Sequence, residues 1–184
     1  MAITAYGHVV ATAPEWVRFC PSCGYSLSTR KVRGVARRVC ERCTHIHYAD
    51  PKVAVGVAVF REDRLLLVRR VMEPGRGLWA LPGGYLDAGE DPRLAAAREV
   101  SEEAGVEVDV GAVLDVFVNS PDDGGAIFLL YAATWRSGEP APGDDADGAA
   151  FFSRDDLPEL AFASTAHVIT HWPSTPPGRQ PPAG

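Results

Sequence analysis

The stretch from residue 84 to residue 106 constrains the fold of this chain more than any other. It predicts a glycine-containing loop followed by one helix. Asp91 is a good N-cap, Pro92 suits the first helical position, and Gly105 suits the position just beyond the last helical residue. The chain must therefore place a short, well-delimited helix directly after a tight loop.

Three glutamates share one face of this helix. Glu99, Glu102 and Glu103 stand at i, i+3 and i+4, which brings their carboxylates within about 6 Å of one another. Like charges this close repel unless a cation lies among them. A hard divalent ion that prefers oxygen ligands, Mg²⁺ or Mn²⁺, is the expected partner.

Apolar and β-branched runs predict the rest of the domain. We expect strands at residues 53–60, 64–70, 106–120, 126–135 and 149–153, and a short strand within 78–84 that runs into a tight turn. Residues 155–160 should form a turn that begins a short helical piece, and a last helix should follow at 165–172, capped by Ser164. The first two strands should form a hairpin that is covered on both faces. On the central helix, the apolar face should consist of Leu94, Ala97, Val100 and Ala104.

Four cysteines occupy positions 20, 23, 40 and 43, a C-x2-C pair repeated after sixteen residues. Two disulfides are the alternative, but no secretion signal is evident, and the spacing is typical of a zinc ribbon. Cys20, Cys23, Cys40 and Cys43 would fill all four positions of a tetrahedral ion, so this site should be structural. His45 and His47 are interpreted as surface or packing residues.

The segment between the cysteine pairs is basic. Six Lys and Arg residues lie in 30–42 against the single acid Glu41. Contact with phosphates of a nucleotide or RNA is one interpretation, and a solvated hairpin is the other. The second is favoured, because no aromatic residues are interleaved with these charges to stack on bases.

The overall charge also bears on partners. A formal net charge of −6 argues against a nucleic-acid-binding protein with one large basic surface and leaves open a local contact through the ribbon. No apolar run is long enough to span a bilayer, so we expect no membrane association and a cytoplasmic location. A homodimer is an open alternative.

Residues 84–106 match the pattern G-x5-E-x7-R-E-U-x-E-E-x-G-U, where U is aliphatic, at every fixed position. The matching residues are Gly84, Glu90, Arg98, Glu99, Val100, Glu102, Glu103, Gly105 and Val106. The sequence thus resembles the Nudix hydrolases. The resemblance implies an α+β fold, the Nudix α/β/α sandwich with a mixed sheet, here preceded by a small zinc ribbon.

By the same resemblance, the chain hydrolyses a nucleoside diphosphate linked to another group, with divalent ions that activate water. Glu102 and Glu103 would ligate metal, Glu99 would ligate metal or act as the base, and the Gly84 carbonyl would assist. Glu90 and Arg98 would form a supporting ion pair. Outside the motif, Asp144, Asp145 or Asp147 would supply a further ligand or the base, with Asp145 preferred; a merely solvated acidic loop is the alternative.

The order ribbon then Nudix domain is similar to NADH pyrophosphatases and to a shorter branch associated with ADP-ribose and FAD hydrolysis. The SQPWPFPxS-like array of the NADH enzymes is missing, and Pro121 lies sixteen residues after Gly105, the offset associated with ADP-ribose pyrophosphatases. ADP-ribose or FAD therefore ranks first, before NADH or NAD-capped RNA. Phe117, Pro121 and Tyr131 are the candidate substrate contacts.

The predicted organisation has four parts. Residues 1–18 form an extension, 19–50 the ribbon, 51–172 the Nudix domain, and 173–184 a proline-rich disordered tail. The competing function, from another class, is a non-catalytic nucleotide- or RNA-binding regulator on the same fold.

Overall fold

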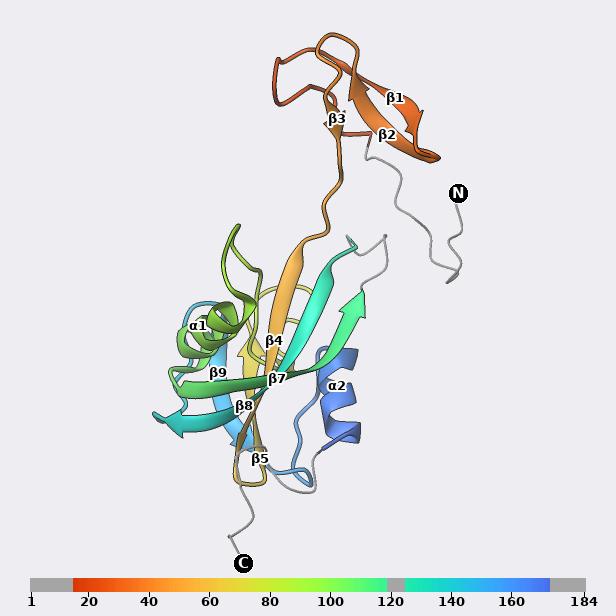
Figure 1. Cartoon of the computed structure of the whole chain (residues 1–184). Helices are drawn as coiled ribbons and strands as arrows, with labels where there is room; N and C mark the ends of the chain where they lie inside the picture. The colour runs from red at the N-terminus through yellow and green to blue at the C-terminus, as the bar shows by residue number, and fades with distance from the viewer. Residues whose placement is uncertain (1–14, 119–124, 173–184) are drawn as a thin grey trace, which may run out of the picture. The chain divides into compact units, whose positions relative to one another are not determined.

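The computed structural model describes residues 15–118 and 125–172. The predictions for Pro121, for the first fourteen residues and for the tail fall outside these ranges. The chain divides into two compact units, residues 1–52 with 119–126, and residues 53–118 with 127–184 (Figure 1). Neither described helix has the length and apolar character needed to cross a membrane.

The first unit is a three-stranded antiparallel sheet. It consists of β1 (Leu27–Val32), β2 (Val35–Cys40) and β3 (Ile46–His47), in that spatial order. Its apolar core is very small: Cys20, Leu27 and Cys40 form a buried cluster with Val17 packed against them, and Val39 is also buried. A core of this size does not stabilise a fold by itself, so this unit depends on what its cysteines bind.

The second unit is built on a mixed sheet with the order β6-β5-β4-β8-β7, in which β9 also pairs with β5. Strands β4 and β8 are parallel and the other pairs are antiparallel, which confirms the predicted mixed sheet. The strands are β4 (Val53–Arg61), β5 (Arg64–Arg70), β6 (Trp79–Ala80), β7 (Glu107–Val118), β8 (Ile127–Ser137) and β9 (Ala146–Phe152).

The β4–β5 hairpin opens after its turn. The two strands pair only at Phe60–Leu65 and Arg61–Arg64. Beyond that point β5 pairs with β9. The backbone of β4 instead forms hydrogen bonds with residues 82–86. This rearrangement brings the loop that precedes the helix alongside the middle of the sheet.

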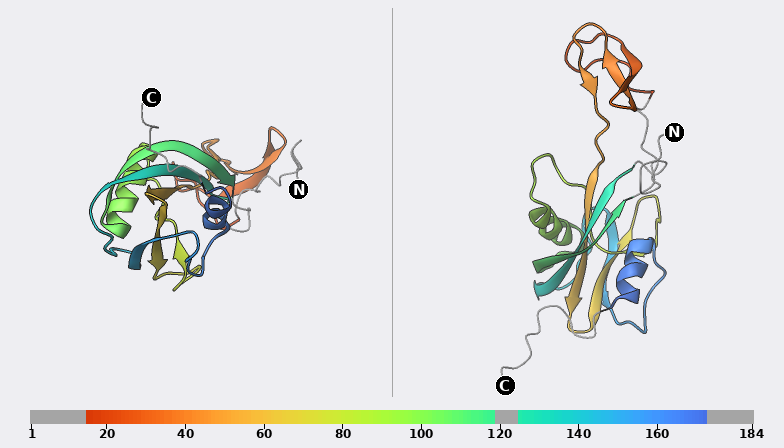
Figure 2. Two further views of the ribbon diagram at one scale, coloured as in Figure 1. Left: turned by 90° about the horizontal axis from the view of Figure 1, so that it is seen from below. Right: turned by 45° about the vertical axis from the view of Figure 1, so that its right-hand side comes forward.

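Two helices, α1 (Pro92–Ala104) and α2 (Ala163–Thr170), lie on opposite sides of the sheet (Figures 1 and 2). Alternating side chains of the central strands fill the two resulting cores. Val55, Val57 and Val59 pack with the α1 side, whereas Ala58 and Phe60 pack with the α2 side. The predicted burial of the hairpin on both faces is therefore confirmed.

Several local predictions were wrong. The short strand expected within 78–84 is present as Trp79–Ala80, but the residues after it run beside β4 as an irregular segment instead of forming a tight turn. No helical turn forms in 155–160, and α2 begins after Phe162 rather than after Ser164. On α1, Leu94 is 68% exposed and the buried face is made by Ala95, Ala96, Val100 and Ala104.

The start of α1 gives a direct test of the fold. The Asp91 carboxylate accepts a hydrogen bond of 2.8 Å from the Arg93 backbone N–H, so Asp91→Ala should lower the free energy of unfolding by about 1 kcal/mol. Urea unfolding followed by circular dichroism measures this loss. The matched control is Ser101→Ala, an exposed position on the same helix, which should cause no loss; an equal loss in both variants would contradict the capping role.

Candidate active site and cysteine cluster

Two glycines bring the loop against both β4 and α1. The Gly84 carbonyl accepts a hydrogen bond of 2.9 Å from the Val55 N–H. A Cβ on Gly83 would collide with the Val55 carbonyl oxygen, and a Cβ on Gly84 would lie 2.5 Å from Glu99 Oε1. A side chain at Gly83 would meet the β4 backbone, and one at Gly84 would displace the Glu99 carboxylate, so the Gly84 backbone lies directly beside that group.

The same loop holds one carboxylate in place. The Gly83 N–H donates to Glu103 Oε2 at 2.9 Å. At the far end of the helix, Gly105 adopts the left-handed conformation with φ of 67° and donates to Ser101 O. The loop before the helix and the glycine after it thus fix the rotation at which α1 presents its acidic face.

Arg98 links three of the acidic residues. Its guanidinium donates to Glu90 through Nε at 2.8 Å and through Nη2 at 3.0 Å. Its Nη1 lies 2.9 Å from Glu99 Oε1 and 2.9 Å from Glu102 Oε2. Arg98 therefore pairs with Glu90 as predicted and also partly neutralises the two neighbouring carboxylates.

The ionisation of these acids differs with their surroundings. Hydrogen bonds from Arg98 and from the Asp87 N–H lower the pKa of Glu90. Burial raises the pKa of Glu99, against the opposing charge of Arg98. Burial also raises the pKa of Glu103 to about 7, and the neighbouring negative charges of Glu99 and Asp145 add to this effect.

The donor set suits a hard divalent cation. Glu99, Glu102 and Glu103 offer carboxylate oxygens, and burial raises the pKa of Glu99 and Glu103. The carbonyl oxygen of Gly84 accepts one hydrogen bond from Val55 and keeps a second lone pair for a cation. A cation bound to these oxygens would favour their ionised forms, against the burial that raises the pKa of Glu99 and Glu103. Within residues 15–118 and 125–172, however, the four cysteines are the only metal-binding side chains whose ligand atoms already lie close enough together to share one ion. The glutamate oxygens are further apart, because Glu99 and Glu102 turn toward Arg98 and Glu103 turns toward Gly83.

The acidic loop between β8 and β9 is attached to the end of α1. Ala141 N–H donates to Ala104 O, and Gly143 N–H donates to Glu103 O. Of the three candidate aspartates, Asp147 forms an ion pair of 2.6 Å with Arg69, and Asp145 acts on the pKa of Glu103. Asp144 is exposed, with φ of 44°.

Arg70 is a cation near the site that the sequence reasoning missed. Its positive charge lowers the pKa of Glu103, against the effect of burial. Its Nε donates to Pro74 O at 2.9 Å, and its guanidinium lies 4.9 Å from the centre of the Phe162 ring. The available signal was the pair Arg69–Arg70, two half-buried cations at the end of an otherwise buried strand.

The predicted aromatic contacts are not equally available. Tyr131 is a core residue on the α1 side and only 5% exposed, so stacking of its ring on a base is contradicted by its burial. Phe117 is half-buried and packs against Phe128 and His167. A substrate contact by Phe117 stays a prediction.

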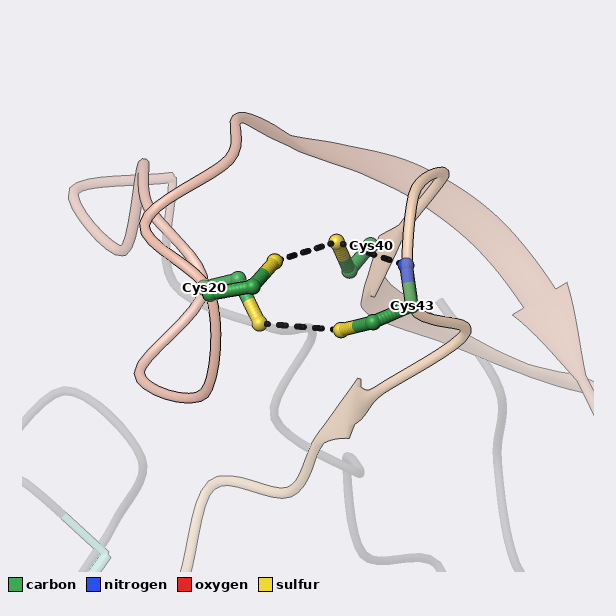
Figure 3. Close-up of side chains that lie close together, drawn as sticks. Cys20, Cys40 and Cys43 are labelled. Carbon is green, nitrogen blue, oxygen red and sulfur yellow. Dashed lines mark hydrogen bonds between the residues drawn. The ribbon is translucent and has the colours of Figure 1, made fainter.

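The four cysteines gather at one point of the first unit (Figure 3). Their sulfur atoms all lie within 4.8 Å of one another, and two pairs, Cys20–Cys43 and Cys23–Cys40, are 3.6 Å apart. That separation excludes disulfides and is near the edge of about 3.8 Å of a tetrahedron with metal–sulfur bonds of about 2.3 Å. The Cys43 N–H donates to Cys40 Sγ and lowers the pKa of that thiol to about 7, which favours the thiolate that a metal requires.

The raised pKa of Glu103 predicts a pH dependence of stability. Between the ordinary value of 4.5 and about 7, the folded protein binds more protons at Glu103 than the unfolded chain does. The stabilisation is therefore present at low pH and is lost as the pH rises through about 7. The measurement is the melting temperature of wild type minus that of Glu103→Gln, without added divalent ions. This difference should decrease from about pH 5 to about pH 8. Glu107→Gln, an exposed control on β7, should show no such trend. If the difference between wild type and Glu103→Gln did not change with pH, the raised pKa of Glu103 would be wrong.

Comparison with known proteins gives the family. Residues 50–172 match the model of the NUDIX domain. The ADP-ribose pyrophosphatase of Methanocaldococcus jannaschii is 38% identical over 62% of this chain and 69% of its own length. The NAD-capped RNA hydrolase NudC of Vibrio vulnificus is 28% identical over 87% of this chain and 58% of its own length, so this chain spans less than two thirds of that relative.

Solved structures agree with this result. A NUDIX hydrolase from Nitrosomonas europaea superimposes with a TM-score of 0.78 at 28% identity, covering 87% of this chain and 95% of that one. An ADP-ribose pyrophosphatase from Streptococcus suis gives a TM-score of 0.55 at 28% identity, over 69% of this chain and 96% of that one. With the matched domain, the mixed sheet and the carboxylate helix in agreement, this chain belongs to the NUDIX family of hydrolases.

Proposed function

We propose that the chain is a divalent-metal-dependent pyrophosphohydrolase that cleaves ADP-ribose or FAD into AMP and a second phosphorylated product. The observation that supports this most is the close approach of the Gly83–Gly84 backbone to Glu99 and Glu103 on α1. It places several oxygen donors at one end of a rigid helix and strand. The pyrophosphatase relatives favour the same reaction.

In this proposal the acids have distinct roles. Glu102 and Glu103 hold the metal, together with Gly84 O and Asp145, and Glu99 holds metal or accepts the proton of the attacking water. Glu90 fixes Arg98, which orients Glu99 and Glu102 through hydrogen bonds of 2.9 Å. When bound, the ion supplies Lewis acidity toward the phosphate oxygens and lowers the pKa of a bound water.

Charge balance supports a metal-dependent reaction. A pyrophosphate brings negative charge to a site that already contains three glutamates and Asp145, and the cations described near them are Arg98 and Arg70. Arg98 is occupied by Glu90. Substrate binding therefore needs added positive charge, which Mg²⁺ or Mn²⁺ provides.

A second candidate is hydrolysis of NADH or of NAD-capped RNA. The NudC relative from Vibrio vulnificus matches over 87% of this chain, against 62% for the Methanocaldococcus jannaschii relative. That longer match favours this second candidate. A cytoplasmic location and the oligomeric state stay predictions.

We further propose that the four-cysteine cluster binds one structural Zn²⁺. Four sulfur ligands leave no open position for substrate or water. The gathering of four sulfurs within 4.8 Å and the very small apolar core of this unit both favour an ion that contributes to folding.

Activity assays test the proposed reaction. Wild type with Mg²⁺ or Mn²⁺ should release AMP from ADP-ribose or FAD, and Glu102→Gln with Glu103→Gln should lower kcat by about a hundredfold or more. Glu107→Gln, which removes an exposed acid outside the site, should retain the wild-type rate. Absence of turnover across ADP-ribose, FAD and NADH, or an unchanged rate in the double variant, would refute the proposal.

Metal analysis tests the cysteine site. Purified protein should contain one zinc per chain, whereas Cys40→Ser, which replaces a buried thiolate, should lose most of it. Ser22→Ala, an exposed neighbour of the same turn, should keep full occupancy. Iron in place of zinc, or unchanged zinc in Cys40→Ser, would show that the assignment is wrong.

A further inference from the structure

The two units of the chain have opposite charge. The first unit, residues 1–52 with 119–126, contains eight Lys and Arg against five Asp and Glu, a formal charge of +3, whereas the second unit contains ten against nineteen, a formal charge of −9. Four thiolates with one divalent ion would still leave the first unit positive. The overall acidity of the chain therefore conceals a compact basic unit.

The fold determines which of these cations are available to a partner. Arg30 is neutralised by Glu41 at 3.0 Å, and Arg38 is directed inward to the carbonyls of Val17 and Leu27. Lys31 and Arg33 are exposed at the tip of the β1–β2 hairpin. Among the described residues neither Lys31 nor Arg33 forms an ion pair with an acid, so their charges face solvent.

The same unit exposes most of the aromatic surface. Of the five strongly exposed Trp, Tyr and Phe side chains within the described ranges, four belong to it: Trp16, Phe19, Tyr25 and Tyr48. Trp16 is 80% and Phe19 66% exposed. Apolar rings displayed on so small a unit are costly in water unless a partner covers them.

One cation and one ring form a defined element. In the sheet Arg30 is paired with Arg37, and Arg38 with His47. Tyr48 follows His47, so it comes next to Arg37 at the end of β3, and the Arg37 guanidinium lies 4.4 Å from the centre of the Tyr48 ring. The sequence reasoning discounted the basic segment because it lacks aromatic residues; the third strand supplies one from outside that segment.

We propose that the first unit binds single-stranded nucleic acid, with Lys31, Arg33 and Arg37 contacting phosphates and Tyr48 stacking on a base. Cations together with exposed rings suit single strands, in which the base faces are free, better than duplexes, whose bases are already stacked. The proposal does not depend on the reaction assigned to the second unit. It adds a binding site for a polynucleotide outside the carboxylate helix.

Fluorescence anisotropy tests this site on the full chain. The protein should contain Glu102→Gln with Glu103→Gln, so that hydrolysis does not alter the probe and failure of the proposed reaction does not affect the result. The probes are a labelled single-stranded RNA of about 12 nucleotides, the same sequence as DNA, and an RNA duplex. Both single strands should bind more tightly than the duplex, and affinity should drop roughly tenfold between about 50 and 200 mM NaCl.

Paired variants separate charge, stacking and folding. Lys31→Glu with Arg33→Glu should weaken binding about tenfold or more, while Arg64→Glu with Arg154→Glu, the same charge change on exposed positions of the second unit, should have little effect. Tyr48→Ala should weaken binding about tenfold, and Tyr48→Phe should retain it because the ring is preserved. Unchanged zinc content would show that each variant is folded.

Several results would overturn the proposal. These are an absence of single-strand binding at low salt, duplex binding as tight as single-strand binding, and equal losses in the two charge-reversal pairs. Capture by anionic phospholipid vesicles without oligonucleotide binding would assign the surface to membranes instead. Equal affinity for RNA and DNA supports contacts to phosphate and base faces, and a preference for RNA supports an added contact to the 2′-hydroxyl.

Discussion

The close packing of backbone against carboxylate at Gly83 and Gly84 is the constraint on which the second unit depends. Hydrogen bonds from β4 to Pro82 O and Gly84 O hold the loop along the strand, and the Gly83 N–H holds Glu103. Strand, loop and helix are therefore fixed in one register. The opening of the β4–β5 hairpin makes this possible, because it frees the edge of β4 that the loop occupies.

The carboxylates of the site repel one another, and the neighbouring cations Arg98 and Arg70 offset this repulsion only in part. Burial of Glu99 and Glu103 opposes their ionisation, and Arg98 is shared among three acids. The buried face of α1 consists mainly of alanines, which let the helix pack near the sheet and keep its acids close to the loop. Replacing such buried charges by apolar residues is often neutral or stabilising, so these acids are not explained by a contribution to stability.

Local sequence rules accounted for the parts of the fold with local causes. Asp91, Pro92 and Gly105 defined α1 to the residue, and the cysteine spacing indicated the cluster of four sulfurs. The errors arose where tertiary contacts decide. Residues 81–84, Leu-Pro-Gly-Gly, have the sequence of a turn but run along β4. Leu94 faces solvent because alanines fit the narrow space against the sheet, and Arg37 contacts a ring from another strand.

The attachment of the acidic loop to α1 has an evolutionary consequence. Because Ala141 and Gly143 satisfy terminal carbonyls of the helix, the stretch from there to Asp145 cannot change length without displacing Asp145, whose charge acts on Glu103. Residues 138–140, between the end of β8 and that attachment, bond to no carbonyl of α1; Gly138 O accepts from Trp135 Nε1, and Glu139 pairs with Arg61 at the protein surface. Descendants of this protein that acquired larger loops for new substrates would be expected to insert them there, leaving the distance from Ala141 to Asp145 intact.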